Sequence, residues 1–153
     1  MTTITNVFDE KNYGKGSEMS SLTVDWGKVG DYILGTFVRA RHSIDTQFGE
    51  NSIYEIFAER GQFNRLDNKI LTGEVVKINK DETWAVWGRS DIFNGQMNSL
   101  RPGQVVKLVY AEDRKGSMGT AKIVKIYAPK DNEGKVMMNQ EWLDNQGVTG
   151  VDM

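Results

Sequence analysis

The chain has 153 residues, among them 16 Gly and 2 Pro, and carries a formal net charge of −2. This length suits one domain with a real core, and the many glycines favour turns and β structure. The lack of Cys and the single His argue against disulfides and against thiolate or histidine metal sites. No apolar run reaches the ~18 residues of a membrane span, and no signal peptide pattern is present, so a cytoplasmic protein is expected. The residues also suggest no cofactor.

The charge is unevenly distributed along the chain. Residues 83–128 hold seven basic and three acidic side chains, a local charge of +4. Residues 130–153 hold two basic and five acidic side chains, a local charge of −3. The basic segment can therefore attract a polyanion although the whole chain is slightly acidic.

Alternating polar and apolar residues predict five strands, at 30–42, 52–60, 83–89, 104–111 and 120–127. Ser90 is a predicted N-cap for a short helix, which ends before Pro102 and Gly103. The charged run 112–116 is a predicted turn between the last two strands. Five strands with a helix between the third and the fourth predict an all-β, OB-fold-like barrel over residues 30–128.

Three segments fall outside this barrel pattern. Residues 1–29 have neither helical nor strand periodicity and are a predicted flexible arm, which Val24 and Trp26 could dock onto the barrel. Residues 61–81 are a predicted insertion that carries a hairpin. Residues 129–153 are a predicted flexible acidic tail with a few apolar residues, including Trp142.

The inventory for catalysis is poor, because no nucleophile and base pair and no complete phosphate-binding loop is present, so we expect no enzyme and no metal site. The inventory for nucleic acid is better, because cations and aromatic rings alternate on three strands and such surfaces hold phosphates and stacked bases. An aromatic residue in a small β domain is more often core, and for Tyr54 and Trp87 both readings stay open. The predicted binding residues are Phe37, Arg39, Arg41, Tyr54, Trp87, Arg89, Lys107, Arg114, Lys115, Lys125 and Tyr127.

The stretch Val86-Trp87-Gly88, a short helix, the segment 100–110, a basic turn and the closing strand 122–127 together resemble phage-type OB-fold single-stranded DNA-binding proteins. The resemblance implies binding of single-stranded DNA with low sequence specificity in phage or mobile-element replication and recombination, in the host cytoplasm and often as an oligomer. It also implies that the acidic tail recruits partner proteins. The tail departs from this pattern at its tip, which ends in Gly150-Val151-Asp152-Met153 rather than in clustered acids and a Pro-Phe pair.

Two other functions remain open. A structural or assembly protein, in a virion or an oligomeric scaffold, would use the barrel as a rigid block and the two terminal extensions to strap neighbouring subunits. An enzyme or a carbohydrate-binding module is supported only by what the fold can accommodate, and a fold alone does not determine function.

Overall fold

The computed structural model describes residues 22–46, 49–117 and 119–146, and most of these described residues are in strands. The all-β prediction is thus confirmed. None of the described helices is long and apolar enough to cross a membrane. The elements in chain order are β1 (Tyr32–Thr46), β2 (Gly49–Asp67), β3 (Ile70–Ile78), β4 (Thr83–Trp87), α1 (Asp91–Asn98), β5 (Val105–Gly116), β6 (Gly119–Tyr127) and α2 (Gln140–Asn145).

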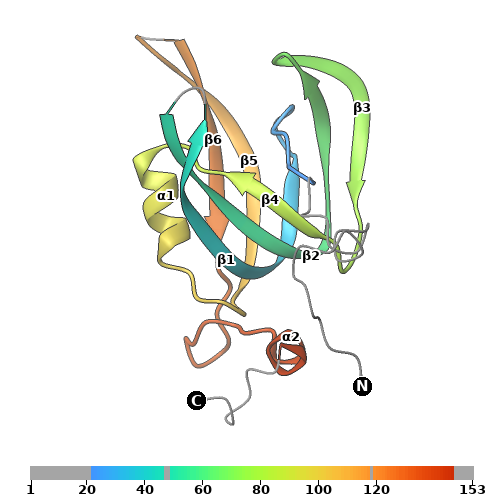
Figure 1. Cartoon of the computed structure of the whole chain (residues 1–153), viewed down its shortest axis with the longest axis vertical. Helices are drawn as coiled ribbons and strands as arrows, with labels where there is room; N and C mark the ends of the chain where they lie inside the picture. The colour runs from blue at the N-terminus through green and yellow to red at the C-terminus, as the bar shows by residue number, and fades with distance from the viewer. Residues whose placement is uncertain (1–21, 47–48, 118, 147–153) are drawn as a thin grey trace, which may run out of the picture.

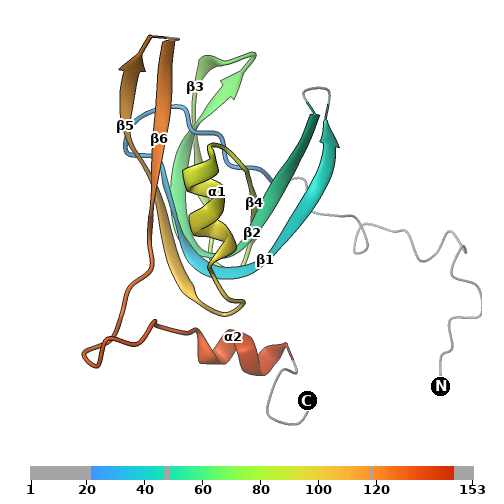
Figure 2. The same ribbon diagram turned by 90° about the vertical axis from the view of Figure 1, so that its left-hand side faces the viewer.

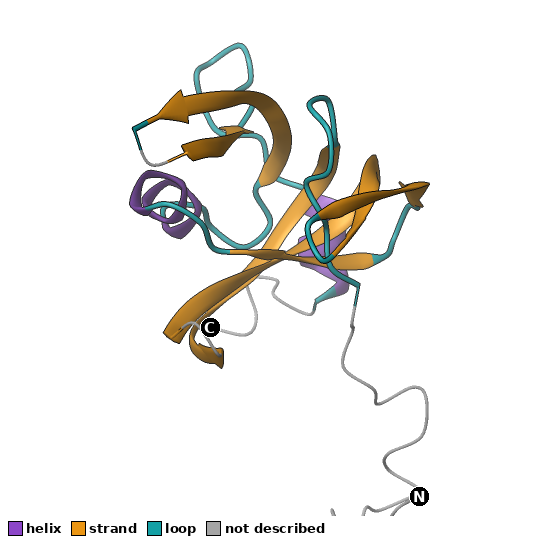
Figure 3. Ribbon diagram, turned by 90° about the horizontal axis from the view of Figure 1, so that it is seen from above, coloured by secondary structure: helices purple, strands orange, loops and turns teal. Residues whose placement is uncertain are grey.

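The six strands form one antiparallel sheet in the order β3-β2-β1-β5-β6, and β4 pairs with β2 beside this path (Figure 1). The prediction of a five-stranded barrel differs from this result. A sixth strand is present, and the sheet is not closed, because no ladder joins β4 to β6 within the described residues. Figure 3 shows that the sheet is strongly curved and twisted, so that it wraps around the core without closing.

Strand β2 is much longer than predicted and belongs to two ladders on the same side. Its first half pairs with β4, and its second half continues to Asp67 and pairs with β3. The turn between β2 and β3 is made by Asn68 and Lys69, both with positive φ (49° and 66°), the conformation that two-residue hairpin turns require. The predicted hairpin in 61–81 is therefore present, but as a continuation of the second strand.

The centre of the chain follows the prediction. Ser90 caps α1, since its Oγ accepts a hydrogen bond from the backbone N–H of Phe93 (3.2 Å). Phe93 and Met97 lie one turn apart on α1 and are both buried against the sheet. Figure 2 shows α1 between the β5–β6 hairpin and the β1–β2 hairpin.

The predicted turn at residues 112–116 is wrong. These residues belong to β5, which continues to Gly116, and they pair with β6 down to Gly119. The hairpin projects beyond the core, so its side chains are exposed on both faces and lack the alternation that marks a half-buried strand.

Both terminal extensions are ordered where the structure describes them. Val24 and Trp26 are in the core, and Thr23 bridges to Ala85 of β4 in parallel. In the tail, the amide of Asn139 donates to the carbonyl of Gly103 (2.7 Å) and starts α2. The described parts of both extensions, residues 22–29 and 129–146, therefore have defined contacts, and Val24 and Trp26 dock the arm onto the sheet as predicted. The rest of the predicted arm and the tail's tip lie outside the described residues.

Gly35 lets β1 and β2 approach closely at the bend of the sheet. A Cβ atom at this position would lie 2.3 Å from the carbonyl oxygen of Phe57, well inside van der Waals contact. Next to it, Ile33 and Ile56 have no exposed surface and form part of the core. The bend therefore brings the inner faces of the sheet together around these side chains.

Candidate nucleic-acid interface

Two arginines from β1 lie on the outer face of the sheet with one glutamate from β2. Arg39 Nε and Arg41 Nε are each 3.0 Å from a different carboxylate oxygen of Glu55. Glu55 is 8% exposed and is almost covered, whereas 59% of the Arg39 side chain remains exposed. The cluster keeps one net positive charge; Arg39 Nε donates a hydrogen bond to Glu55, whereas the buried Arg41 Nε is at ion-pair distance without a hydrogen bond.

Trp87 extends this face across β4. Arg41, Ile53 and Trp87 are register neighbours on β1, β2 and β4, so their side chains form one row. In β4 the buried residues are Trp84 and Val86, and Trp87 on the opposite side is partly exposed. The outer face therefore combines an aromatic ring and two arginines.

Phe37 and Tyr54, which were also predicted to bind, are in the core. Phe37 is 3% exposed and Tyr54 has no exposed surface. The register of β1 and β2 shifts between Phe37 and Arg39, so Phe37 faces inward while the arginines face outward. The Tyr54 hydroxyl donates to Asn98 Oδ1 (3.2 Å), and burial raises the pKa of this phenol. No base could stack on either ring while the core is intact.

A groove lies between α1 and β6, where the sheet fails to close; we call it the seam groove. Its volume is about 650 Å³. The charged residues among those that line it are Arg89, Arg114 and Lys122, and no carboxylate is among them. Phe93 and Ile92 supply apolar surface, and Ile92 is 77% exposed. Arg89 follows Trp87 by two residues, so the groove begins next to the outer face.

Two cations of the seam groove, Arg89 and Lys122, are close enough to repel each other. Burial lowers the pKa of Arg89, and burial followed by the nearby charge of Arg89 lowers the pKa of Lys122, while Asp113, Asp25 and Asp31 act on Lys122 in the opposite direction. Lys122 Nζ donates to the carbonyl of Trp26 and lies 5.7 Å from the centre of the Tyr110 ring. An anion in the groove would relieve the repulsion between these two cations.

Arg114 is the most available cation of the groove. Its Nη2 is 2.8 Å from Glu112 Oε1, but both side chains are largely exposed, so exchanging this partner for a phosphate would cost little. Lys115 pairs with Thr120 in the register of β5 and β6, is exposed, and does not line the groove.

The remaining predicted residues lie on the outward face of β5 and β6, away from the groove lining. Lys107 and Tyr127 are opposite each other in register, and Lys125 is on the same face. Lys107 Nζ is 5.3 Å from the centre of the Tyr32 ring, and Tyr127 is 51% exposed. The structure thus separates the predicted binding residues into an outer face, a groove, a second outward face, two core positions and the exposed Lys115 of the β5–β6 hairpin.

Sequence reasoning missed Lys122 and Ile92. Lys122 was counted only in the charge balance, because the supposed turn at 112–116 hid its pairing with Asp113. The apolar residues of this segment predict one apolar helix side that includes Ile92, whereas only Phe93 and Met97 of α1 are buried. In α1, Phe93 and Met97 are four residues apart and so share one helix face. This spacing was the signal that Ile92 lies off the buried face.

No cluster of three or more metal-ligating side chains occurs among the described residues. Comparisons with protein-family models, with curated protein sequences and with solved structures give no match for this chain.

Proposed function

We propose that this protein binds single-stranded DNA with low sequence specificity, and that the seam groove holds its phosphates. The observation that carries the proposal is the groove lining, in which all three charged side chains are cations. Single strands are bound by cations that follow the backbone and by aromatic rings on which bases stack. Trp87 supplies such a ring directly before Gly88, the first residue of the chain that lines the groove.

The connectivity also supports the proposal. Strand β1 is flanked by β2 and β5, β4 pairs with β2, and α1 connects β4 to β5. An OB-fold has this arrangement with a further contact that closes the barrel, so we propose an open variant in which the β3 hairpin is an insertion. Such a protein would cover single strands exposed during replication or recombination, as the resemblance to phage proteins implies.

Low specificity follows from the kinds of contact that are available. Guanidinium and ammonium groups in the groove would contact phosphates, which are the same for every base. Stacking on Trp87 is also tolerant of sequence, because every base has a π face. The preference for single strands would come from stacking, since bases in a duplex are already stacked on one another.

The direct test is fluorescence anisotropy of a labelled oligo-dT, and of a duplex of equal length, titrated with the full chain at 50 and 200 mM salt. We expect tighter binding of the single strand and a clear loss of affinity at the higher salt, because phosphate contacts release counterions. Absence of binding at 50 mM salt, or binding that salt does not change, would refute the proposal.

Replacement of two aromatic residues shows which face takes part. Trp87→Ala removes a ring that would stack with one base, and stacking contributes about 1 to 3 kcal/mol per base, so affinity should fall about 5- to 150-fold. Tyr127→Ala removes an exposed ring from the outward face of β6. A loss with Tyr127→Ala equal to that with Trp87→Ala would show that this second face also binds DNA.

An assembly function is the second candidate, and the edge strand β3 is the observation that favours it. Within the described residues β3 pairs only with β2, and Ile70, Leu71 and Val75 are 70%, 43% and 58% exposed. Free edges with apolar side chains favour pairing with another strand. Light scattering of the wild type and of Val75→Lys tests this candidate: a monomer at high concentration in both would refute it.

A further inference from the structure

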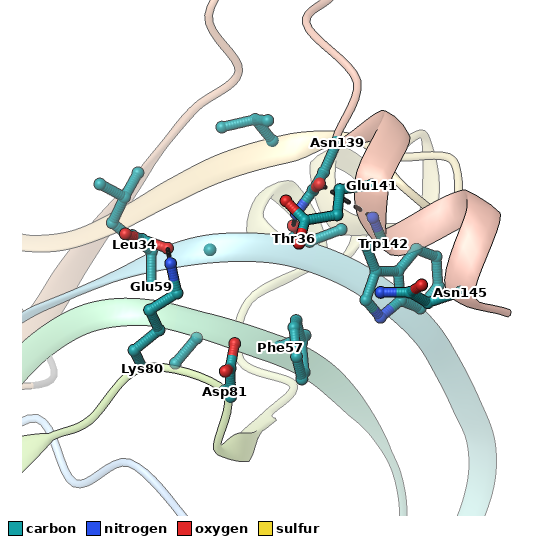
Figure 4. A pocket seen from close by; sticks show the side chains of 13 residues that line it. Leu34, Thr36, Phe57, Glu59, Lys80, Asp81, Asn139, Glu141, Trp142 and Asn145 are labelled. Atoms are coloured by element: carbon teal, nitrogen blue, oxygen red, sulfur yellow. Dashed lines mark hydrogen bonds and ion pairs between the residues drawn. The ribbon is translucent and has the colours of Figure 1, made fainter.

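A second cavity, of about 480 Å³, lies between α2 and the bend of β1 and β2 (Figure 4). This volume is in the range of ligand-binding pockets. Phe57 of β2 and Trp142 of α2 contribute aromatic rings, and Leu34 adds aliphatic surface. Trp142 is 9% exposed. In Figure 1 the cavity's helix, α2, lies at the end of the molecule opposite the tip of the β5–β6 hairpin.

The α2 wall of this cavity is fixed in position. Asn139 Nδ2 donates a hydrogen bond to Thr36 Oγ1 on β1 (2.7 Å), and Asn139 Oδ1 accepts one from the backbone N–H of Trp142 (3.0 Å). The same residue therefore caps the helix and ties it to the sheet. The amide of Val105 donates to the carbonyl of Met137 (2.9 Å), which anchors the chain before α2. The helix that bounds the cavity is thus anchored to the sheet at its N-cap, Asn139, and just before it, at Met137.

The polar groups around the cavity are mainly acidic. Glu59, Asp81 and Glu141 contribute carboxylates, and Lys80 is the one basic lining residue. Lys80 Nζ lies 3.6 Å from Glu59 Oε2, so its charge is shared with that carboxylate. Asp81 and Glu141 form no ion pair among the described residues. The lining has a formal charge of −2, opposite in sign to that of the seam groove.

We propose that this cavity binds an arginine side chain from an extended segment of a partner protein. Aromatic rings attract a cation through their π faces, and the planar guanidinium can stack on a ring while it donates to carboxylates. The aliphatic part of the arginine would pack on Leu34 and Phe57, and its head would reach Asp81 and Glu141. A nucleic acid does not fit, because its phosphates would meet unpaired carboxylates.

This inference does not depend on DNA binding, because the cavity shares no lining residue with the seam groove. If oligo-dT fails to bind, the peptide experiment below still tests the cavity. If the peptide fails to bind, the anisotropy experiment still tests DNA binding in the seam groove.

The test uses capped tripeptides Gly-Arg-Gly, Gly-Lys-Gly and Gly-Gln-Gly and follows the indole N–H of Trp142 by NMR, assigned with Trp142→Phe. We expect the arginine peptide to shift this signal saturably, the lysine peptide to bind several-fold more weakly, and the glutamine peptide to have no effect. No shift with the arginine peptide, or equal affinity for all three peptides, would overturn the proposal.

A pair of double variants separates the site from general electrostatics. Asp81→Asn with Glu141→Gln removes the two unpaired carboxylates and should weaken binding of the arginine peptide about 2- to 30-fold, the effect of two exposed ion pairs. Glu74→Gln with Glu133→Gln changes the net charge equally at exposed positions outside the cavity. An equal loss in both double variants would overturn the proposal.

Discussion

Neutralising the seam groove should remove a defined part of the salt dependence of DNA binding. Each phosphate contact contributes about −0.7 to the slope of log affinity against log salt for a single strand. Three cations therefore account for a slope of about −2, and a fourfold rise in salt should weaken the groove's contribution about 20-fold. The triple variant Arg89→Gln, Arg114→Gln, Lys122→Gln should lose this part of the slope in an anisotropy titration of oligo-dT.

The matched control is Lys69→Gln, Lys130→Gln, Lys135→Gln, which changes the net charge by the same amount at exposed positions outside the groove. Its slope should stay near that of the wild type. If both triple variants lower the slope equally, the general field of the protein binds DNA and the reasoning from the groove is refuted.

Lys122 also contacts the backbone of Trp26, so its replacement could weaken the fold. The double variant Arg89→Gln, Arg114→Gln avoids this contact and should reduce the slope by about 1.4. Circular dichroism melts of all variants show whether they are folded at the temperature of the titration. An unchanged slope in a folded double variant would contradict the assignment of these two arginines.

Three further predictions concern stability. Gly35→Ala should lower the free energy of unfolding in urea by about 2 to 3 kcal/mol, because the new Cβ has no room. Gly95→Ala in α1, where the space is open, should raise this free energy by up to about 1 kcal/mol. The opposite order of the two variants would contradict the packing at the bend. Burial, and to a smaller extent the hydrogen bond with Asp113, raises the pKa of Tyr110 to about 12. The neutral phenol therefore stabilises the fold fully below pH 10, and this stabilisation is lost between pH 10 and 12. In Tyr110→Phe the free energy of unfolding in urea should fall less steeply over that interval, and a fall as steep as in the wild type would refute this. Asn139→Ala should speed proteolysis of residues 129–146, because loss of the N-cap of α2 costs about 1 kcal/mol, while the thermal unfolding midpoint of the protein should change little. An unaltered cleavage rate would show that other contacts hold the tail.

The sequence predicted the parts of the fold that are buried on one side. In β4 and at the start of β5, buried residues alternate with less buried ones because one face of each strand packs on the core. The helix cap at Ser90 was also visible, because its side chain makes a local contact that depends on few other residues. Local chemistry and half-burial therefore carry most of the predictable information in this chain.

The parts that could not be predicted are those exposed on both faces or determined by distant residues. The outer ends of β2 and β5 lack alternation, so residues 61–67 and 112–116 were not assigned to strands. The missing closure between β4 and β6 depends on tertiary packing rather than on either strand's own residues. The ordered tail depends on Asn139 and Thr36, which are far apart in the chain and have no shared sequence signal.

The candidate site was predictable only as far as strand parity holds. Alternation places Arg39, Arg41 and Phe37 on one face, but the register shift between Phe37 and Arg39 turns the phenylalanine inward. A single sequence does not reveal such a bulge. The partial burial of Trp87 follows from its position at the end of β4, opposite in parity to Val86.

The narrow junction between β1 and β5 has a consequence for the order of folding. Five residue pairs, between Tyr32–Thr36 and Val105–Val109, make this ladder, and its formation closes a loop of residues 37–104. The β1–β2 and β5–β6 ladders close much shorter loops, so their entropic cost is lower and we expect them to form earlier. The β1–β5 ladder should then form late, so that substitutions in it mainly accelerate unfolding and leave the folding rate nearly unchanged.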